Sequence, residues 1–278
     1  MQKRNFILNE NNKKPIFVDI RFVSSTKSKP MVIFCHGFKG FKDWGHFNLI
    51  ADYFANAGFV FVKFSFSHNG TTAAHLCDFD DLKAFGHNNF SIELNDAKLV
   101  LDYIYNNANQ LEGDKNNITI IGHSRGGGIA ILMANLDSRI QKLITWASVC
   151  DFNYFFSNID LNKWKSNGIV NIYNARTKQE MPLYYQFYED YLRNKELLNI
   201  QNAAENLSKP WLILHGSNDQ AVSVDAALQL HEWNLNSTLE IINDADHTFG
   251  GKHPYDTTLL PEHTEHLLKT SILFLDNN

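Results

Sequence analysis

Short apolar runs alternate along the chain with stretches whose apolar residues recur at helical spacing. Continuous apolar runs of four to eight residues are typical of strands buried on both faces of a parallel sheet. We predict strands at residues 16–23, 31–35, 59–66, 118–121, 142–150, 211–216 and 238–242.

Helical segments fill the intervals between these strands. The segment SIELNDAKLVLDYIYNNA places Ala97, Leu101, Ile104 and Ala108 on one helical face. Further helices are predicted at 46–58, directly after the strand at 118–121, near 224–233 and near 262–274. This alternation predicts an α/β fold, with a mostly parallel central sheet flanked by helices.

One long interruption breaks the alternation. Residues 151–205 continue for about fifty residues without the strand–helix rhythm, far beyond an ordinary connection. The segment is rich in aromatic residues, with DFNYFF at its start and PLYYQFYEDYLRN near its end. We therefore divide the chain into a core, residues 1–150 and 206–278, and an inserted cap, residues 151–205. The cap aromatics either fill a core of its own helices or line a substrate pocket.

Composition and charge exclude several classes of protein. The chain has 278 residues, of which 44% are hydrophobic and 20% charged, as is ordinary for a soluble globular protein. A formal net charge of -5 without a basic cluster argues against nucleic-acid partners and anionic membrane surfaces. The segment MQKRNFILNENNKK lacks the apolar run of a signal peptide, and no run is long enough to span a membrane. A cytoplasmic protein is expected, with a homodimer left open.

Cysteine and histidine spacing offers no metal or disulfide framework. Cys35, Cys77 and Cys150 are odd in number and far apart in the chain, so a disulfide framework is not expected. They do not combine with histidines at zinc-ligand spacing. We expect neither a metal nor a cofactor.

The segment NNITIIGHSRGGGIAILMANL carries the first chemical signal. Gly122-His123-Ser124-Arg125-Gly126 has the Gly-x-Ser-x-Gly pattern, between a predicted strand and a predicted helix. In this context the pattern is typical of a nucleophile elbow, where the serine occupies a strained turn and glycines avoid collisions between strand and helix. We predict Ser124 as the nucleophile, because packing alone would explain Gly122 and Gly126 but not the acid and the histidine that follow in the required order.

A serine needs a base, and the base needs an orienting acid. The elbow predicts the chain order serine, acid, histidine. Asp219 follows the strand at 211–216, and His247 follows the strand at 238–242, so all three residues fall at the carboxyl edge of the sheet. Two alternatives stay open: Asp219 as a helix cap only, and His68 as a substrate contact.

The oxyanion formed by attack at a carbonyl also needs hydrogen-bond donors. The elbow fold takes one backbone N–H from the residue after the nucleophile, here Arg125. The second comes from a loop after an early strand, and HGFKG places Phe38 there. The backbone N–H groups of Phe38 and Arg125 are therefore the predicted oxyanion hole.

The motifs HGFKG, GHSRGG, HGSNDQAV and ADHTF together resemble the α/β-hydrolase superfamily. More narrowly, they are similar to bacterial cinnamoyl (feruloyl) esterase-like and dienelactone-hydrolase-like carboxylesterases, over about residues 17–274. The resemblance implies a triad of Ser124, Asp219 and His247, and it places a cap where the insertion lies. Dienelactone hydrolases use a cysteine nucleophile, so the serine of this elbow argues against their chemistry.

The predicted function is a serine carboxylesterase that hydrolyses small aryl or short-chain esters through an acyl-enzyme. The expected partner is a small-molecule ester. Two other readings remain: a peptidase, thioesterase or amidase on the same scaffold, and a ligand-binding protein that has lost turnover.

Overall fold

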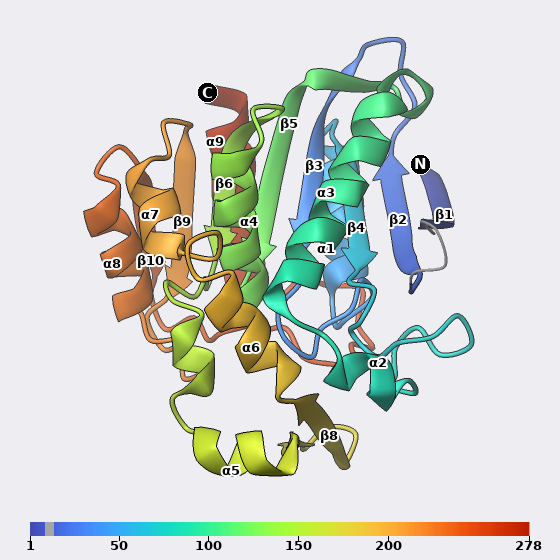
Figure 1. The fold of residues 1–278 in the computed structure, drawn as a ribbon. Coiled ribbons are helices and arrows are strands. Elements are labelled where there is room, and N and C mark those ends of the chain that lie inside the picture. Colours follow the sequence, from blue (N-terminus) through green and yellow to red (C-terminus); the bar gives the residue numbers. More distant parts are fainter. Residues whose placement is uncertain (9–13, 278) are drawn as a thin grey trace.

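One large sheet forms the centre of the computed structural model, which describes residues 1–8 and 14–277 (Figure 1). Its strands in these ranges are β1 (Gln2–Leu8), β2 (Ile16–Phe22), β3 (Lys29–Cys35), β4 (Val60–Ser65), β5 (Gly113–His123), β6 (Ile140–Trp146), β9 (Trp211–Gly216) and β10 (Thr238–Ile242). They are ordered β1-β2-β4-β3-β5-β6-β9-β10 across the sheet. β2 runs antiparallel to both of its neighbours, and all the other neighbouring pairs are parallel.

Helices cover both faces of this sheet. The longer ones are α1 (Phe47–Asn56), α3 (Phe90–Asn106), α4 (Arg125–Leu136), α8 (Asp225–Trp233) and α9 (Glu262–Asn277). Figure 1 shows α3 and α4 in front of the sheet and α1 and α9 behind it. Neighbouring residues of β5 enter opposite cores, since Ile120 packs on the side of α3 and α4 and Ile121 on the side of α1 and α9. A strand covered on both faces has to be apolar throughout, which explains the continuous runs.

The predicted α/β-hydrolase fold, with a mostly parallel sheet flanked by helices, is confirmed. Each strand predicted from an apolar run overlaps a strand of the large sheet. The four residues predicted to share one helical face are all buried: Ala97, Leu101, Ile104 and Ala108. The last of them lies in a short 3₁₀ helix, η1 (Ala108–Leu111), that follows α3.

Two boundaries differ from the prediction. β1 was not predicted, because most of its residues are exposed and polar; it pairs with β2 by main-chain hydrogen bonds, with Gln2 opposite Phe22. The strand predicted to run to residue 150 ends at Trp146. There Ala147 takes a positive φ of 48° and turns the chain out of the sheet. Residues 9–13 of the segment analysed for a signal peptide lie outside the described residues.

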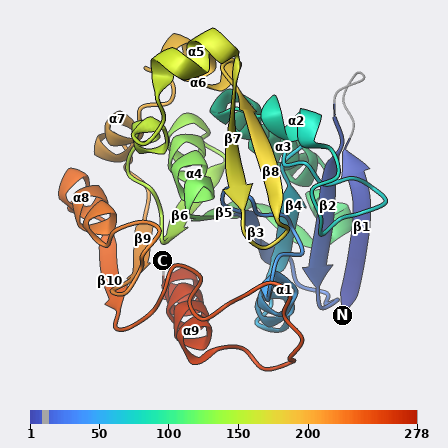
Figure 2. The ribbon, with the colours of Figure 1, turned by 90° about the horizontal axis from the view of Figure 1, so that it is seen from below.

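The inserted segment contains strands as well as helices. Its elements are η2 (Asn153–Phe156), α5 (Leu161–Asn167), β7 (Ile169–Asn174), β8 (Gln179–Tyr184), α6 (Gln186–Arg193) and α7 (Ile200–Glu205). β7 and β8 form a separate antiparallel hairpin, so the insertion is not purely helical. Figures 1 and 2 show this hairpin and α5 at the end of the molecule where the parallel strands terminate. Within residues 1–8 and 14–277, no helix has the length and apolar character needed to cross a bilayer.

Candidate active site

Ser124 occupies a sharp turn between β5 and α4. Its backbone has φ 57° and ψ -123°, a region that side-chain-bearing residues rarely adopt. The turn is held on both sides: the Ser124 N–H donates to the carbonyl of Trp146 at 2.9 Å, and the Ser124 carbonyl accepts from Gly127 N–H at 2.9 Å. These bonds hold the strained turn in place at the carboxyl edge of the sheet.

The two glycines that flank Ser124 are required by packing. A Cβ added to Gly122 would lie 2.2 Å from the carbonyl oxygen of Gly126. A Cβ on Gly126 would lie 2.4 Å from the carbonyl oxygen of Cys35 in the neighbouring strand. Both obstacles are backbone atoms, which cannot move aside. The elbow pattern therefore has the steric cause that the sequence suggested.

His247 lies between Ser124 and Asp219. Its Nε2 is 3.0 Å from Ser124 Oγ, and its Nδ1 is 2.7 Å from Asp219 Oδ2. The carboxylate accepts the proton on Nδ1, which leaves the Nε2 lone pair directed at the serine hydroxyl. His123 holds the backbone of His247 in position, because its Nε2–H donates to the His247 carbonyl at 2.8 Å. Burial lowers the pKa of His123 to about 3, so it acts as a neutral donor.

Asp219 is held in place by four donors. Its Oδ1 accepts from the N–H groups of Ala221 at 2.8 Å and Val222 at 2.9 Å, which caps the turn after β9. Its Oδ2 accepts from His247 and lies 3.2 Å from His215 Nε2. Burial alone would raise the pKa of Asp219, but the hydrogen bonds from His215, His247 and the backbone outweigh it and lower the pKa. The carboxylate therefore both caps a turn and orients His247.

Hydrogen bonds of His36 fix the orientation of the peptide between Gly37 and Phe38. His36 Nε2 accepts from Phe66 N–H at 3.2 Å, so its proton sits on Nδ1 and is donated to the Gly37 carbonyl at 2.8 Å. Burial lowers the pKa of His36 to about 4, which keeps this neutral tautomer. In a trans peptide the N–H points opposite to the C=O. The Phe38 N–H is therefore directed away from His36.

Close packing sets the distance of this peptide from the serine. A Cβ on Gly37 would lie 2.8 Å from Ser124 Cβ and 3.3 Å from its Oγ. Arg125 is the first residue of α4, where backbone N–H groups have no intrahelical acceptor. The two predicted oxyanion donors, Phe38 and Arg125, thus both belong to backbone that adjoins Ser124.

The side chain of Arg125 does not enter the site. Its guanidinium forms a buried ion pair with Glu93 of α3 and lies 4.3 Å from the ring centroid of Phe38. Rings from the insertion also surround it, with Phe155 at 5.6 Å and Phe187 at 5.9 Å. Burial raises the pKa of the Glu93 carboxyl, and the charge of Arg125 only partly offsets this. The pair therefore ties the first turn of α4 to α3 and to the insertion.

Removing one partner of this pair should destabilise the protein strongly. Replacing Glu93 with alanine leaves the buried Arg125 guanidinium without its carboxylate partner, and we expect a loss of about 3–5 kcal/mol in unfolding free energy. Equilibrium urea unfolding followed by fluorescence measures it. Asn95→Ala, at an exposed position of the same helix, serves as control and should change stability by less than about 0.5 kcal/mol. A Glu93→Ala protein as stable as the control would contradict the assignment.

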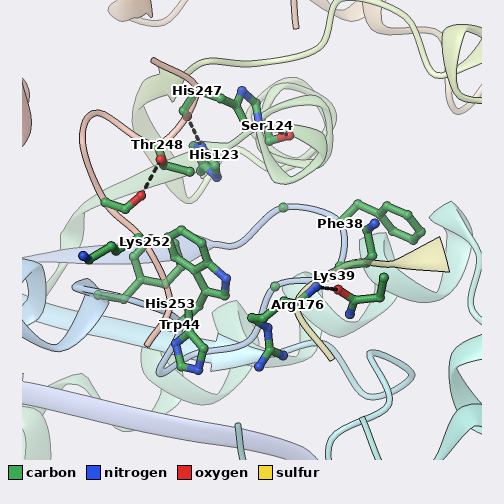
Figure 3. Close-up of a pocket in the computed structure, with 15 residues that line it drawn as sticks. Phe38, Lys39, Trp44, His123, Ser124, Arg176, His247, Thr248, Lys252 and His253 are labelled. Carbon is green, nitrogen blue, oxygen red and sulfur yellow. Dashed lines mark hydrogen bonds between the residues drawn. The ribbon is translucent and has the colours of Figure 1, made fainter. Parts of the chain in front are cut away.

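A pocket of about 400 Å³ opens beside Ser124 (Figure 3). It is lined by Gly37, Phe38, Lys39, Gly40, Trp44, Phe47, His123, Ser124, Asn174, Arg176, His247, Thr248, Gly251, Lys252 and His253. The insertion contributes only Asn174 and Arg176 to this lining. The many aromatic residues of the insertion pack instead with one another and with α3, for example Phe156 with Trp164 and Phe187. Of the two roles left open for them, this structure favours the filling of a core.

Some lining residues were missed from the sequence. Trp44, Arg176, Lys252 and His253 lie in loops without a motif. His253 is half-buried and accepts a hydrogen bond from Gly45 N–H at 2.8 Å. The only sequence signal was the glycine at 45, where a Cβ would lie 2.7 Å from the Lys252 carbonyl. His68, the open alternative for a substrate contact, is bonded to Ser67 Oγ and is absent from the lining.

Comparisons with known proteins identify related sequences. A sequence profile of the BD-FAE family matches residues 18–234 of the chain. A relative from Mycoplasma genitalium, described as an esterase/lipase, is 26% identical over 243 residues, which cover 78% of this chain and 82% of the relative. The family match runs from β2 to α8 and includes the insertion.

Solved structures share the fold over almost the whole chain. Est1E from Butyrivibrio proteoclasticus, solved with ferulic acid bound, matches with a TM-score of 0.70 at 17% identity, over 98% of each chain. The esterase domain of a Rhodothermus marinus protein matches with a TM-score of 0.60 at 17% identity, over 90% of this chain and 91% of that one. At such identities the likeness concerns the fold.

Proposed function

The chain belongs to the BD-FAE family and is an α/β-hydrolase of the esterase type; from that premise we propose that it is a serine carboxylesterase acting through Ser124, His247 and Asp219. The observation that carries the proposal is the continuous hydrogen-bonded row from Asp219 through His247 to Ser124 Oγ, with bonds of 2.7 and 3.0 Å. A hydroxyl, a neutral imidazole and an ionised carboxylate in this order form the arrangement that activates a serine.

The reaction begins with proton transfer. His247 Nε2 takes the proton of Ser124 as Oγ attacks the ester carbonyl, and the carbonyl oxygen becomes an oxyanion. The backbone N–H groups of Phe38 and Arg125 donate to that oxyanion, each contributing about 10²–10³ in rate. The imidazolium of His247 forms beside the Asp219 carboxylate, whose lowered pKa keeps it ionised and able to stabilise the positive charge.

The collapse of the tetrahedral intermediate releases the alcohol. His247 returns its proton to the leaving oxygen, and the acyl group remains on Ser124. A water then loses a proton to His247 and attacks the acyl carbonyl, and the second intermediate expels Ser124 Oγ, which regains its proton. The products are a carboxylic acid and an alcohol, and Ser124 is restored.

The pocket supports a small substrate. Its volume of about 400 Å³ lies at the lower end of small-molecule sites, and Phe38, Trp44 and Phe47 provide apolar walls. We therefore propose short-chain or aryl esters, and a long acyl chain finds no matching cavity there. The ferulic acid bound by Est1E is an aryl acid of this size class. Residues 151–205 would act as a cap, which reaches the pocket through the turn between β7 and β8.

The proposal is tested by labelling the nucleophile during turnover. The protein is expected to hydrolyse p-nitrophenyl butyrate and to lose this activity when a fluorophosphonate adds one phosphonyl group to Ser124. Peptide mass spectrometry locates the label, and the residual activity should fall in step with label stoichiometry. Hydrolysis that survives complete labelling, or a label on another residue, would contradict Ser124 as the nucleophile. Absence of both turnover and labelling would reject the esterase proposal.

A further inference from the structure

Positively charged side chains line the pocket beside Ser124, and negatively charged ones do not. Three of its lining residues are lysine or arginine, namely Lys39, Arg176 and Lys252, and none is Asp or Glu. Figure 3 shows these three side chains around one pocket, each from a different loop. Lys39 follows β3, Arg176 lies between β7 and β8, and Lys252 follows His247. Three separate loops thus bring positive charge to one pocket, although the chain as a whole carries a net charge of -5.

Lys39 lies nearest in the chain to the oxyanion loop, one residue after Phe38. It takes a positive φ of 55°, and its ammonium lies 5.7 Å from the Phe38 ring centroid. The side chain is half-buried, and burial lowers its pKa. Within the described ranges, no acidic side chain forms an ion pair with it. A half-buried ammonium without a counter-charge is costly unless a ligand supplies one.

Arg176 is held in position but only weakly neutralised. Its N–H donates to Asn174 Oδ1 at 3.2 Å, which fixes the turn, and its guanidinium lies 5.5 Å from the ring of Phe79. Its acidic neighbour is Asp78, with a separation of 3.6 Å. Because the Asp78 side chain is 64% exposed, water screens this pair and it contributes little. The guanidinium Nη2 also donates to the Cys77 carbonyl at 3.4 Å, and the fork of five N–H donors leaves others to bind a second anion.

His253, which also lines the pocket, does not cancel the positive charge. His253 Nδ1 accepts from Gly45 N–H, and burial, followed by the nearby charge of Arg176, lowers the pKa of His253. The imidazole is therefore neutral beside Arg176. Lys252 is exposed and would add to the field at the rim of the pocket.

We propose that the natural substrate of this site is an ester that carries an anionic group, such as a carboxylate, bound by Lys39 and Arg176 while Ser124 attacks the ester carbonyl. The inference rests on the proposed esterase function, which it deepens by assigning a charge to the substrate. Charge-assisted hydrogen bonds to a carboxylate are stronger than neutral ones. The aromatic walls exclude part of the water that would otherwise screen the charges.

Matched esters that differ in charge test the proposal. One pair places the charge on the acyl side: the p-nitrophenyl monoester of adipic acid and p-nitrophenyl hexanoate have acyl chains of equal length and the same leaving group. A second pair places it on the alcohol side: para-acetoxybenzoate and its methyl ester. In at least one pair we expect kcat/KM to favour the anion by about tenfold, a preference that declines as salt is raised.

Variants connect the preference to named side chains. Arg176→Gln and Lys39→Gln should each lower the ratio of anionic to neutral kcat/KM by about three- to tenfold. Arg176→Lys keeps the charge and should retain most of the ratio. Lys178→Gln changes a lysine in the same turn that does not line the pocket, and it should leave the ratio unchanged. A ratio insensitive to Arg176→Gln and Lys39→Gln would overturn the assignment.

The two proposals fail in distinguishable ways. Turnover of neutral esters without any preference for the anionic member of either pair would overturn the anionic substrate and leave the esterase intact. Equilibrium dialysis of the adipate and hexanoate esters against Ser124→Ala protein measures binding without turnover. Selective binding of the anion, combined with no hydrolysis by the parent protein, would support the charged pocket and reject the esterase. Equal binding and no hydrolysis would reject both.

Discussion

Replacing Ser124 with alanine is expected to lower kcat/KM for p-nitrophenyl butyrate by about 10⁵–10⁶-fold, because loss of the nucleophile removes the whole acyl-enzyme route. The residual rate would come from substrate binding and the oxyanion donors alone. Initial rates measured at high enzyme concentration, after removal of any contaminating esterase, determine the ratio. A Ser124→Ala protein within about tenfold of the parent would reject Ser124 as the nucleophile.

The Ser124→Ala protein should remain folded. The only side-chain hydrogen bond of Ser124 in the described structure is the one to His247, and the bonds that hold the elbow use its backbone. Alanine accepts the positive φ of 57° about as well as serine. Urea unfolding should therefore agree with that of the parent within about 1 kcal/mol. Ser157→Ala, an exposed serine in the insertion, controls for the loss of a hydroxyl and should keep full activity.

Replacing His247 with alanine should have an effect of similar size, about 10⁵–10⁶-fold in kcat, because the serine then has no base and the leaving alcohol has no acid. His215 cannot take over, since its Nε2 is engaged by Val222 and Asp219. Added imidazole should restore part of the rate by entering the space left by the side chain. The measurement is kcat against imidazole concentration, at pH values above and below the pKa of free imidazole.

Two observations separate a lost base from a damaged fold. Asp219 keeps its bonds from Ala221, Val222 and His215 in the His247→Ala protein, so its buried carboxylate remains satisfied and stability should change little. His266→Ala, at an exposed histidine on α9, should retain full activity. A His247→Ala protein that is folded and nearly as active as the parent would show that another group serves as base.

The core and the candidate triad could be predicted from the sequence because the requirements of strand burial and of the tight turn are visible in short stretches of the chain. Buried parallel strands have to be apolar on both faces, and the elbow needs glycine at 122 and 126 for backbone clearance. The order of Ser124, Asp219 and His247 follows from strand ends that meet at one edge. The position of Arg125 directly after Ser124 indicated the role of its backbone N–H, whereas the buried ion pair of its side chain with Glu93 depends on a contact distant in the sequence.

The insertion and the pocket could not be predicted in the same way, because their structure depends on contacts distant in the sequence. β7 and β8 alternate weakly between buried and exposed residues, and their pairing is stabilised by packing of Met181 and Leu183 onto the core. Arg176 becomes a pocket residue only because this hairpin reaches the oxyanion loop. His253 is drawn inward by a bond to Gly45, which precedes it by about two hundred residues. Contacts between residues so far apart in the chain leave no periodic pattern in the sequence.

Arg125 has one role through its backbone and another through its side chain. Its backbone N–H is a proposed oxyanion donor, while its guanidinium is clamped by Glu93 and by rings of the insertion, Phe155 and Phe187. Undocking of the insertion would expose this cation and loosen the first turn of α4, where the donor lies. On the proposed mechanism, the position of the Arg125 oxyanion donor therefore depends on contacts that only a docked insertion completes.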